Sequence, residues 1–488
     1  MKELKELLYG VSIDAVQGST AIQINQVTAD SRIVEGQDLF VAISGVAIDG
    51  HEFIEKAIKN GARAVVCERI PSDLAEKSKV TFIRVDNSRK AYGIIASNYY
   101  DNPSASFKLI AVTGTNGKTS VSSMLFALFQ KLGYSCGLVS TIDIRVGNEV
   151  LKTSHTTPDA MQLHKVFHQM KSKGVAFCFM EASSHGIHQF RLSGIDVDAA
   201  VFTNLTQDHL DYHQTFAQYR DAKKMLFDQL SANAFALTNL DDKNGLFMLQ
   251  NCKANKLTYG LKNHADVKAN ILEQQFSGTF LRIETQEIWI KLVGEFNVYN
   301  IAAVYGVAAA LGADKEEVLK ELSLLEPVKG RFEFISSSNG IKAVIDYAHT
   351  PDAIENVLNT INTLKTSDNR LITLMGCGGN RDQSKRPLMG KIAATLSDEV
   401  FFTSDNPRDE DPEQIITQII SGVRAVDRHK YDVVIDRKEA IQKAVKIAQP
   451  GDVILIAGKG HETYQEIKGE KQHFDDLEIT KNEFAKLN

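Results

Sequence analysis

Apolar runs separated by amphipathic stretches predict alternating strands and helices along most of the chain. Apolar strands of this kind favour a parallel sheet covered on both faces. The first series lies between residues 108 and 240 and reads KLIAVTG, CGLVST, VAFCFMEA, DAAVFTNL and AFALTNL. The second follows residue 328 and reads KAVIDYA, RLITLMG, EVFFTSD, YDVVI and DVILIAG. We expect each series to form its own α/β unit, and the second to be doubly wound.

Three further sequence patterns indicate where these α/β units begin and end. The strand-like DLFVAISG and ARAVVCE, with the helical HEFIEKAIKNG between them, predict a small α/β domain at the start of the chain. Asn, Pro and Ser cluster in residues 97–107, as in a linker. Alternating residues near 267–293 predict an antiparallel hairpin layer. We therefore predict a small α/β domain over 1–100, a central P-loop-type ATPase domain over 101–328, and a C-terminal Rossmann-like domain over 329–488.

Composition is consistent with a soluble multidomain protein. Of 488 residues, 43% are hydrophobic and 24% are charged, and the formal net charge of -6 favours neither nucleic acid nor an anionic membrane. No apolar run reaches the ~18 residues that a membrane span needs. The opening MKELKELLYG predicts a charged helix without a signal-peptide core. The five cysteines lack CxxC spacing, so we expect reduced thiols in a cytoplasmic protein.

The stretch AVTGTNGKTS (111–120) lies where a predicted strand becomes a helix. Gly114 and Gly117 would let backbone N–H groups close around phosphate oxygens, Lys118 could reach the terminal phosphates, and the Thr119 hydroxyl could bind Mg²⁺. The full phosphate-loop pattern has a glycine where Val112 stands, so the match is partial. A strand followed by Gly-Lys-Thr nevertheless predicts phosphate binding.

Two further strand ends offer metal ligands. Glu181 ends the strand VAFCFMEA and could hold Mg²⁺ or cap the following turn, and His209 leaves the next strand in the same way. Lys223 and Lys224 follow on an amphipathic helix, where Lys224 is expected in solvent. An ammonium about 5 Å from Mg²⁺ would be repelled by roughly 6–7 kcal/mol at an effective dielectric near 20. Lys223 therefore either points elsewhere or reacts with CO₂ to give an anionic carbamate.

Eight motifs in order resemble the motif set of the Mur ligases: TGTNGKT, EASSH, TNLTQDHLDYH, YRDAKKMLF, GEFNVYN, GRFE, DYAHTPD and GKGHE. The first domain, with TADSRIVEGQDLFVAISGVAIDGHEF, resembles the UDP-binding domain of the branch that adds the third peptide residue. This resemblance implies that ATP phosphorylates the D-glutamate carboxylate of UDP-N-acetylmuramoyl-L-alanyl-D-glutamate. The amine of a free amino acid then attacks the acyl-phosphate. It also implies a monomer with Mg²⁺ and ATP bound.

The resemblance assigns roles by motif. The implied catalytic set is Lys118, Glu181, His209, Lys223 and Asp346. ATP is implied to contact Gly114, Thr115, Asn116, Gly117, Lys118, Thr119, Ser120, Asn297, Asn300 and Arg331. Mg²⁺ is implied at Thr119, Glu181, His209 and carbamylated Lys223. The UDP-sugar-dipeptide is implied at Ser31, Thr156, Thr157, Ser184, Gln189 and Arg191. His155 stands where the family has asparagine, so one substrate contact is expected to differ.

The motif DNPR, Asp405, Asn406, Pro407 and Arg408, resembles the family's recognition motif for meso-diaminopimelate. A guanidinium suits the distal carboxylate of that amino acid, which lysine lacks. Arg381, Gly458 and Glu462 match the rest of the pocket, and Glu462 suits the distal ammonium. Among the acids that follow, Asp411 before Pro412 predicts a helix N-cap, while Asp409 and Glu410 are expected in a solvated turn.

Three alternatives stay open at this point. The first is the same ligation with L-lysine, alone or alongside diaminopimelate. The second is a folylpolyglutamate synthase-like ligase, which shares the ATPase architecture but lacks a UDP-binding domain. The third is a nucleotide-binding scaffold without catalysis, which the presence of Lys118, Glu181, Lys223 and Asp346 disfavours.

Overall fold

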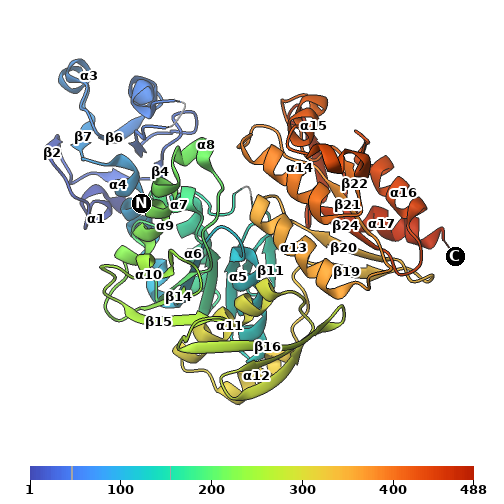
Figure 1. Ribbon diagram of the computed structural model, residues 1–488. Helices are drawn as coiled ribbons and strands as arrows, with labels where there is room; N and C mark the ends of the chain where they lie inside the picture. The colour runs from blue at the N-terminus through green and yellow to red at the C-terminus, as the bar shows by residue number, and fades with distance from the viewer. Residues whose placement is uncertain (46–47, 154, 488) are drawn as a thin grey trace.

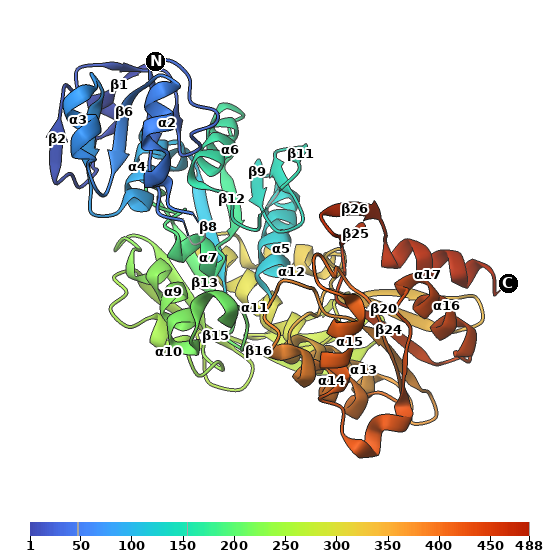
Figure 2. The same cartoon turned by 90° about the horizontal axis from the view of Figure 1, so that it is seen from above.

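Three separate sheets organise the chain in the computed structural model, which describes residues 1–45, 48–153 and 155–487. In both views the N-terminal and C-terminal domains lie on either side of the central domain (Figures 1 and 2). The predicted three-domain α/β architecture is therefore confirmed. Within the described residues, no helix is both long and apolar enough to cross a membrane. All five cysteines are buried with free thiols.

The N-terminal sheet has the order β2-β7-β6-β5-β4, in which only β2 is antiparallel to its neighbour. Its strands are β2 (Ala15–Gln17), β4 (Val27–Thr28), β5 (Asp38–Val41), β6 (Ala62–Cys67) and β7 (Thr81–Arg84), and β1 (Lys2–Glu3) pairs with β3 (Gln23–Ile24). Its helices are α1 (Leu4–Leu7), α2 (Ile54–Lys59), α3 (Ser72–Lys77) and α4 (Ser88–Tyr99). The predicted opening helix is thus a single turn. The predicted linker is partly ordered, because α4 enters it and residues 103–106 form a 3₁₀ turn.

The central sheet has eleven strands in the order β11-β10-β9-β12-β8-β13-β14-β15-β16-β17-β18. Neighbours from β9 to β16 are parallel, while β10, β11, β17 and β18 add antiparallel edges. The strands are β8 (Lys108–Thr113), β9 (Cys136–Val139), β10 (Ile144–Val146), β11 (Glu149–Leu151), β12 (Phe177–Glu181), β13 (Ala199–Phe202), β14 (Phe235–Asn239), β15 (Asn255–Gly260), β16 (Val267–Gln275), β17 (Gly278–Ile283) and β18 (Gln286–Ile290). The predicted hairpin layer is therefore antiparallel, and it continues the main sheet instead of forming a separate layer.

Successive residues of β8 point to opposite faces, and both faces are covered. Ile110 packs in one core with Val121 of α5, whereas Leu109 packs in another with Phe167 of α6. This explains why the strand is apolar from Leu109 to Val112. The helices of this domain are α5 (Lys118–Lys131), α6 (Ala160–Ser172), α7 (Ser184–His188), α8 (Leu210–His213), α9 (Phe216–Asp228), α10 (Gly245–Met248), α11 (Glu295–Ala310) and α12 (Lys315–Ser323).

The C-terminal sheet has the order β19-β20-β24-β21-β22-β23, with only β19 antiparallel. Its strands are β19 (Glu333–Ser336), β20 (Lys342–Asp346), β21 (Leu371–Met375), β22 (Glu399–Phe402), β23 (Tyr431–Val433) and β24 (Val453–Ala457). Its helices are α13 (Pro351–Leu364), α14 (Lys385–Leu396), α15 (Pro412–Ile420), α16 (Arg437–Ile447) and α17 (Asp476–Ala485). Two cores lie on the two faces of this sheet, as predicted for a doubly wound unit. A small hairpin of β25 (Tyr464–Ile467) and β26 (Glu470–His473), which the sequence did not predict, follows β24.

Candidate functional site

The loop between β8 and α5 needs its glycines. Gly114 and Gly117 have φ values of +149° and +87°. A Cβ at Gly114 would lie 1.9 Å from Thr203 Oγ1, and one at Gly117 would lie 2.7 Å from Asn300 Oδ1. The loop is thus pressed between the end of β13 and helix α11. This brings Asn300, predicted from a distant motif, beside the predicted phosphate loop.

Two lysines converge on this loop. Lys118 donates from Nζ to the carbonyl oxygens of Gly114 (3.0 Å) and Thr115 (2.7 Å), and Lys223 donates to the same Gly114 oxygen at 2.7 Å. Burial lowers the pKa of both lysines, and the charge of Lys118 lowers that of Lys223 further. A neutral amine is the form that reacts with CO₂. Lys224 is buried against Asp228, so its predicted exposure was wrong.

Glu181 is fully buried and faces the start of α5. Its carboxylate accepts hydrogen bonds from Thr119 Oγ1 (3.0 Å), the Thr141 backbone N–H (2.6 Å) and Thr141 Oγ1 (3.1 Å). The next helix is capped by Ser183, whose hydroxyl accepts from the Gly186 N–H at 3.1 Å. The alternative role of Glu181 as a cap is therefore wrong. Its oxygens instead lie beside the predicted Mg²⁺ ligand Thr119.

His209 occupies a left-handed turn, with φ of 55°, immediately before α8. Burial has the largest effect on the pKa of His209 and lowers it to about 3. The negative charge of Asp208, whose carboxylate lies 3.4 Å from Nε2, opposes this shift. The imidazole is therefore neutral at pH 7, as a metal ligand must be. The described residues contain no group of three or more His, Cys, Asp or Glu side chains that could hold a metal. Mg²⁺ fits such a donor set, because it usually takes few protein oxygens and completes its shell with phosphate and water.

Three contacts join this centre to the C-terminal domain. Arg331 Nη2 donates to Thr119 Oγ1 at 3.1 Å. Asn116 of the loop donates to Asp352 of α13 at 2.8 Å. Lys385, at the start of α14, forms a buried ion pair with Asp208 at 3.4 Å. The C-terminal domain therefore contributes charged groups directly to the predicted phosphate centre.

The other predicted nucleotide residues lie around the same junction. Asn297 and Asn300 are buried in α11, where Asn297 donates to Val293 O at 2.8 Å and Asn300 donates to Asn297 Oδ1 at 3.2 Å. Asp346 ends β20, accepts from the Phe332 N–H at 2.7 Å, and has a pKa raised by burial. Ser120 is buried in the first turn of α5.

Four of the six residues predicted at the UDP-sugar-dipeptide, Thr156, Thr157, Gln189 and Arg191, are connected through Thr141 and Glu181. Thr156 accepts from Thr141 Oγ1 at 3.0 Å, and Thr157 donates to Glu181 O at 2.8 Å. Arg191 donates to Thr157 O and, at 2.7 Å, to Gln189 Oε1. Ser184 lies 3.0 Å from His213 Nε2. Ser31 belongs to the N-terminal domain, where its carbonyl accepts from Asn60 at 2.9 Å.

The loop after β22 carries the DNPR motif into the C-terminal domain's ligand face. Arg408 is half-buried, with φ of 52°, and donates from Nη1 to Gly379 O at 2.7 Å. Its Nε lies 3.5 Å from Oε2 of Glu466, an acid of the β25–β26 hairpin. Its backbone bridges to the β25–β26 hairpin, which holds the loop in place. Among the described residues, Nη1 makes the side-chain hydrogen bond of Arg408 and Nη2 makes none, so Nη2 is available for a carboxylate.

Of the acids after Arg408, Asp411 has the role that was predicted and Glu410 does not. Asp411 caps α15, accepting from the Glu413 N–H at 2.9 Å, as predicted. Glu410 is not simply solvated, because it forms a two-point ion pair with the fully buried Arg386, at 2.7 and 2.9 Å. The prediction for Glu410 was therefore wrong, since Arg386 lies far away in the sequence.

Comparison with known proteins decides the family. Three family models match: "Mur ligase family, catalytic domain" over residues 23–100, "Mur ligase middle domain" over 112–308, and "Mur ligase, glutamate ligase domain" over 330–460. A protein of Parabacteroides distasonis named UDP-N-acetylmuramoyl-L-alanyl-D-glutamate--2,6-diaminopimelate ligase is 49% identical, over 99% of both chains. The chain belongs to the Mur ligase family.

Solved structures agree with this Mur ligase assignment. A structure of a UDP-N-acetylmuramoyl-L-alanyl-D-glutamate--2,6-diaminopimelate ligase covers 100% of this chain and 99% of its own, at 34% identity and a TM-score of 0.69. A folylpolyglutamate synthase of Mycobacterium tuberculosis, complexed with ADP, covers 74% of this chain and 90% of its own, at 19% identity and a TM-score of 0.62. The second likeness concerns the fold alone.

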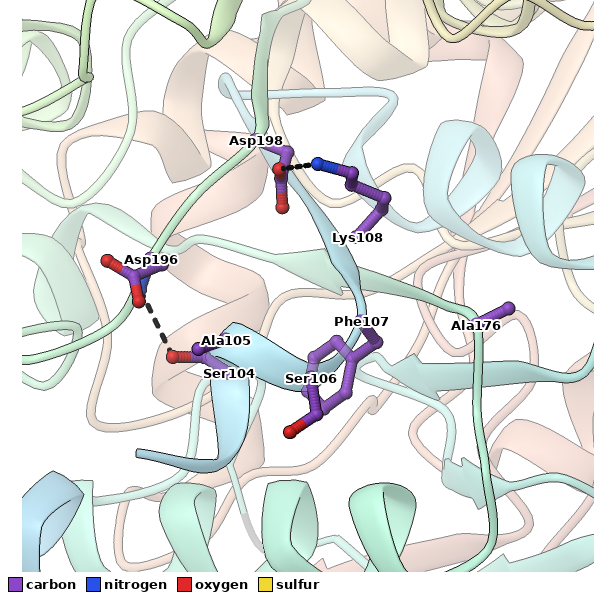
Figure 3. Close-up of a pocket in the computed structure, with 8 residues that line it drawn as sticks. All are labelled: Ser104, Ala105, Ser106, Phe107, Lys108, Ala176, Asp196 and Asp198. Atoms are coloured by element: carbon purple, nitrogen blue, oxygen red, sulfur yellow. Dashed lines mark hydrogen bonds and ion pairs between the residues drawn. The ribbon is translucent and has the colours of Figure 1, made fainter. Parts of the chain in front are cut away.

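A pocket of about 480 Å³ elsewhere in this Mur ligase lies apart from the site. Figure 3 shows Lys108 pointing to Asp198, and these two lining residues form an ion pair of 2.8 Å. It lies at the amino ends of β8, β12 and β13, whereas ligands of parallel sheets bind at the carboxyl ends. None of the predicted site residues lines it.

Several site residues of this Mur ligase were missed from sequence. Thr141 follows β9 at the same sheet edge as Glu181, so its position after a buried strand was an available signal. Glu466 contacts Arg408 of the DNPR loop. Lys459 contacts Asn406 of the same loop and also Glu462. Lys385 reaches Asp208 across the domain junction, and no local pattern marks that contact.

Proposed function

We propose that this Mur ligase adds meso-diaminopimelate to the D-glutamate carboxylate of UDP-N-acetylmuramoyl-L-alanyl-D-glutamate, in peptidoglycan precursor synthesis. Relatives with this name span almost the whole chain, which supports the reaction. The choice of amino acid rests on the contacts of the Arg408 side chain. Its guanidinium is held by Gly379 O on one side and keeps its outer Nη donors for a ligand carboxylate. Such a planar fork suits the distal carboxylate of diaminopimelate.

The reaction needs the substrate carboxylate to become an electrophile. ATP transfers its terminal phosphoryl group to that carboxylate, giving an acyl-phosphate and ADP. The uncharged amine of the amino acid then attacks the acyl carbon, forming the amide and releasing phosphate and a proton. Lys118 and Arg331 supply positive charge where phosphate oxygens develop negative charge.

The residues that would hold Mg²⁺ are Thr119, Glu181, His209 and a carbamate on Lys223. Bound there, the ion would neutralise phosphate charge during transfer. Burial and the neighbouring Lys118 favour the neutral amine of Lys223, which supports its carbamylation. Glu181 is oriented by Thr119 and Thr141, so its carboxylate is already fixed at the end of β12.

Each substrate has its own proposed set of contact residues, and these sets come from all three domains. We propose that Thr156, Thr157, Ser184, Gln189 and Arg191 contact the sugar-dipeptide, while Ser31 contacts the uridine end from the N-terminal domain. The nucleotide lies among residues 114–120, Asn297, Asn300 and Arg331. The amino acid lies among Arg381, residues 405–408, Gly458 and Glu462. We also propose domain boundaries near residues 100 and 328, a monomer, and a cytoplasmic location, where ATP and the UDP-linked substrate occur together.

The main alternative is the same ligation with L-lysine. Lysine would leave the outer donors of Arg408 without a carboxylate, and sites that lose a polar partner can reject a substrate by roughly 10⁴. A folylpolyglutamate synthase-like activity is disfavoured, because that structural likeness leaves a quarter of the chain unmatched.

An omission assay tests this function. ADP release is measured with Mg·ATP, the UDP-dipeptide and meso-diaminopimelate, and then with each one left out. We expect release only with all three. ADP release independent of the UDP-dipeptide, or tight ATP binding without any turnover, would contradict the proposed ligation.

A further inference from the structure

Lys459 is a fully buried lysine in the loop that follows β24. It stands between Gly458, with φ of +114°, and Gly460, with φ of +51°. A Cβ at Gly458 would lie 2.5 Å from Asp405 Oδ2, and one at Gly460 would lie 2.7 Å from Gly330 O. The backbone is thus packed tightly on both sides. This fixes the direction in which the Lys459 side chain enters the amino-acid pocket.

The ammonium of Lys459 binds two residues predicted to contact the amino acid. Nζ donates to Asn406 Oδ1 at 3.0 Å and to Glu462 Oε2 at 3.1 Å. Asn406 closes the triangle, because its Nδ2 donates to the same Glu462 oxygen at 2.8 Å. Within the described residues, Oε1 of Glu462 has no hydrogen-bond donor. Lys459 and Asn406 therefore hold one carboxylate oxygen and leave the other for a ligand ammonium.

Charge in the pocket divides into two halves. The first half holds Asp405 and Glu462, both largely buried, and Lys459, so its net charge is -1. This half matches one ligand ammonium. Burial raises the pKa of Glu462, repulsion by the Asp405 carboxylate raises it further, and the charge of Lys459 opposes both effects.

The second half holds Arg381, Arg408 and Glu466, with a net charge of +1. Arg408 and Arg381 both flank Gly378, and Glu466 lies against Arg408. This half matches one ligand carboxylate. The whole pocket is therefore neutral only because of the Lys459 charge, and it suits a distal group that carries one positive and one negative charge.

We infer that Lys459 determines specificity between amino acids with a zwitterionic distal end and those with a purely cationic one, by cancelling one carboxylate charge beside Glu462. This rests on the proposed function. Diaminopimelate and lysine share the distal ammonium, so loss of Lys459 changes that contact equally for both. Only the carboxylate of diaminopimelate meets the added negative charge. The preference for diaminopimelate therefore falls when Lys459 loses its charge.

The test measures kcat/KM for meso-diaminopimelate and for L-lysine with the UDP-dipeptide and Mg·ATP. We expect Lys459→Met to lower the ratio of the two values by about tenfold or more, while the KM for ATP stays within about threefold. Lys471→Met is the matched control. Both lysines lie over the ring of Tyr464, at 5.6 Å for Lys459 and 4.1 Å for Lys471, but Lys471 is exposed and has no bond to Glu462. The control is expected to keep the wild-type ratio.

Two further variants keep the inference testable if Lys459→Met folds poorly. Glu462→Gln removes a negative charge, so the ratio of diaminopimelate to lysine use is expected to rise. The double variant Lys459→Met/Glu462→Gln restores the net charge, and its ratio is expected to return toward wild type. Equal loss of both substrates in Lys459→Met, with no opposite shift in Glu462→Gln, would show that Lys459 is only structural. A wild-type enzyme that uses neither amino acid would refute the proposed function instead.

Discussion

Glu410 anchors the loop that carries Arg408, through its ion pair with the fully buried Arg386. The Arg386 guanidinium also donates to Gln418 Oε1 at 2.7 Å and Gly378 O at 3.0 Å. Glu410 in turn accepts from the backbone N–H of Asn380, beside the predicted amino-acid pocket. Glu410→Ala should therefore loosen both α14 and the DNPR loop.

The magnitude follows from the burial of the two partners. Removing one partner of a buried ion pair costs about 3–5 kcal/mol, because the other charge is left buried and unpaired. Here the Glu410 side chain keeps 23% of its exposure, and Arg386 keeps two other acceptors. We therefore expect a loss of about 2–3 kcal/mol in local stability. At about 1.4 kcal/mol for each tenfold change, this is roughly a 30- to 140-fold increase in the equilibrium constant for local opening.

Hydrogen exchange followed by mass spectrometry measures this opening directly in α14 and residues 405–411. Asp409→Ala is the matched control, since Asp409 is the preceding residue, is exposed, and among the described residues makes its hydrogen bonds with Asn380. It should change exchange by no more than an ordinary surface substitution, about 0.5 kcal/mol. Similar exchange in Glu410→Ala and Asp409→Ala would refute this account of the loop.

The same pair predicts a pH dependence of stability. The Arg386 guanidinium holds the pKa of Glu410 below its usual value in the folded protein. A lowered carboxyl pKa contributes stability above the unfolded pKa, near 4.3, and that contribution is lost as pH falls through the folded value. The difference in melting temperature between wild type and Glu410→Ala should therefore shrink below about pH 4. A difference that stays constant down to pH 3 would contradict the ion pair.

Three other variants test the site. Lys223→Ala should abolish ligation, and short carboxylates such as acetate should restore part of the ADP release; full activity without rescue would exclude the carbamate. Arg408→Ala should raise the KM for diaminopimelate by about a hundredfold, the value of two charge-assisted hydrogen bonds, with little change in the KM for ATP. An equal rise in both KM values would make Arg408 structural. Lys385→Met should leave Asp208 buried without its ion-pair partner, lowering kcat by about tenfold or more and speeding hydrogen exchange in residues 206–213; unchanged values of both would exclude the pair as a domain contact.

Most of the sheet architecture could be predicted from the sequence, because parallel strands buried on both faces must be apolar along their length. The β25–β26 hairpin could not, since YQEIKGEKQH is polar and half-exposed and has no apolar face to reveal it. Its stability comes instead from contacts with residues 405–408, which are distant in sequence.

The candidate site also contains residues whose positions the sequence could predict and residues whose partners it could not. Glu181 ends the buried strand β12, and Lys118 begins α5 after the short loop that follows the buried strand β8, so their positions were predictable from local pattern. Lys224 and Glu410 were assigned to solvent because charged residues usually lie there. Lys224 instead pairs with Asp228, four residues on in the same helix, and with the Gln250 carbonyl, and Glu410 pairs with Arg386. Only the fold brings Gln250 and Arg386 near. Local sequence does not indicate such partners.

One competition experiment tests the central claim most directly. The wild-type protein is given Mg·ATP, the UDP-dipeptide, and equal concentrations of meso-diaminopimelate and L-lysine, and the products are separated by mass. We expect the diaminopimelate adduct almost alone, with one ADP released for each product formed. A lysine adduct in equal or greater amount would contradict the role assigned to Arg408 and the amino-acid pocket.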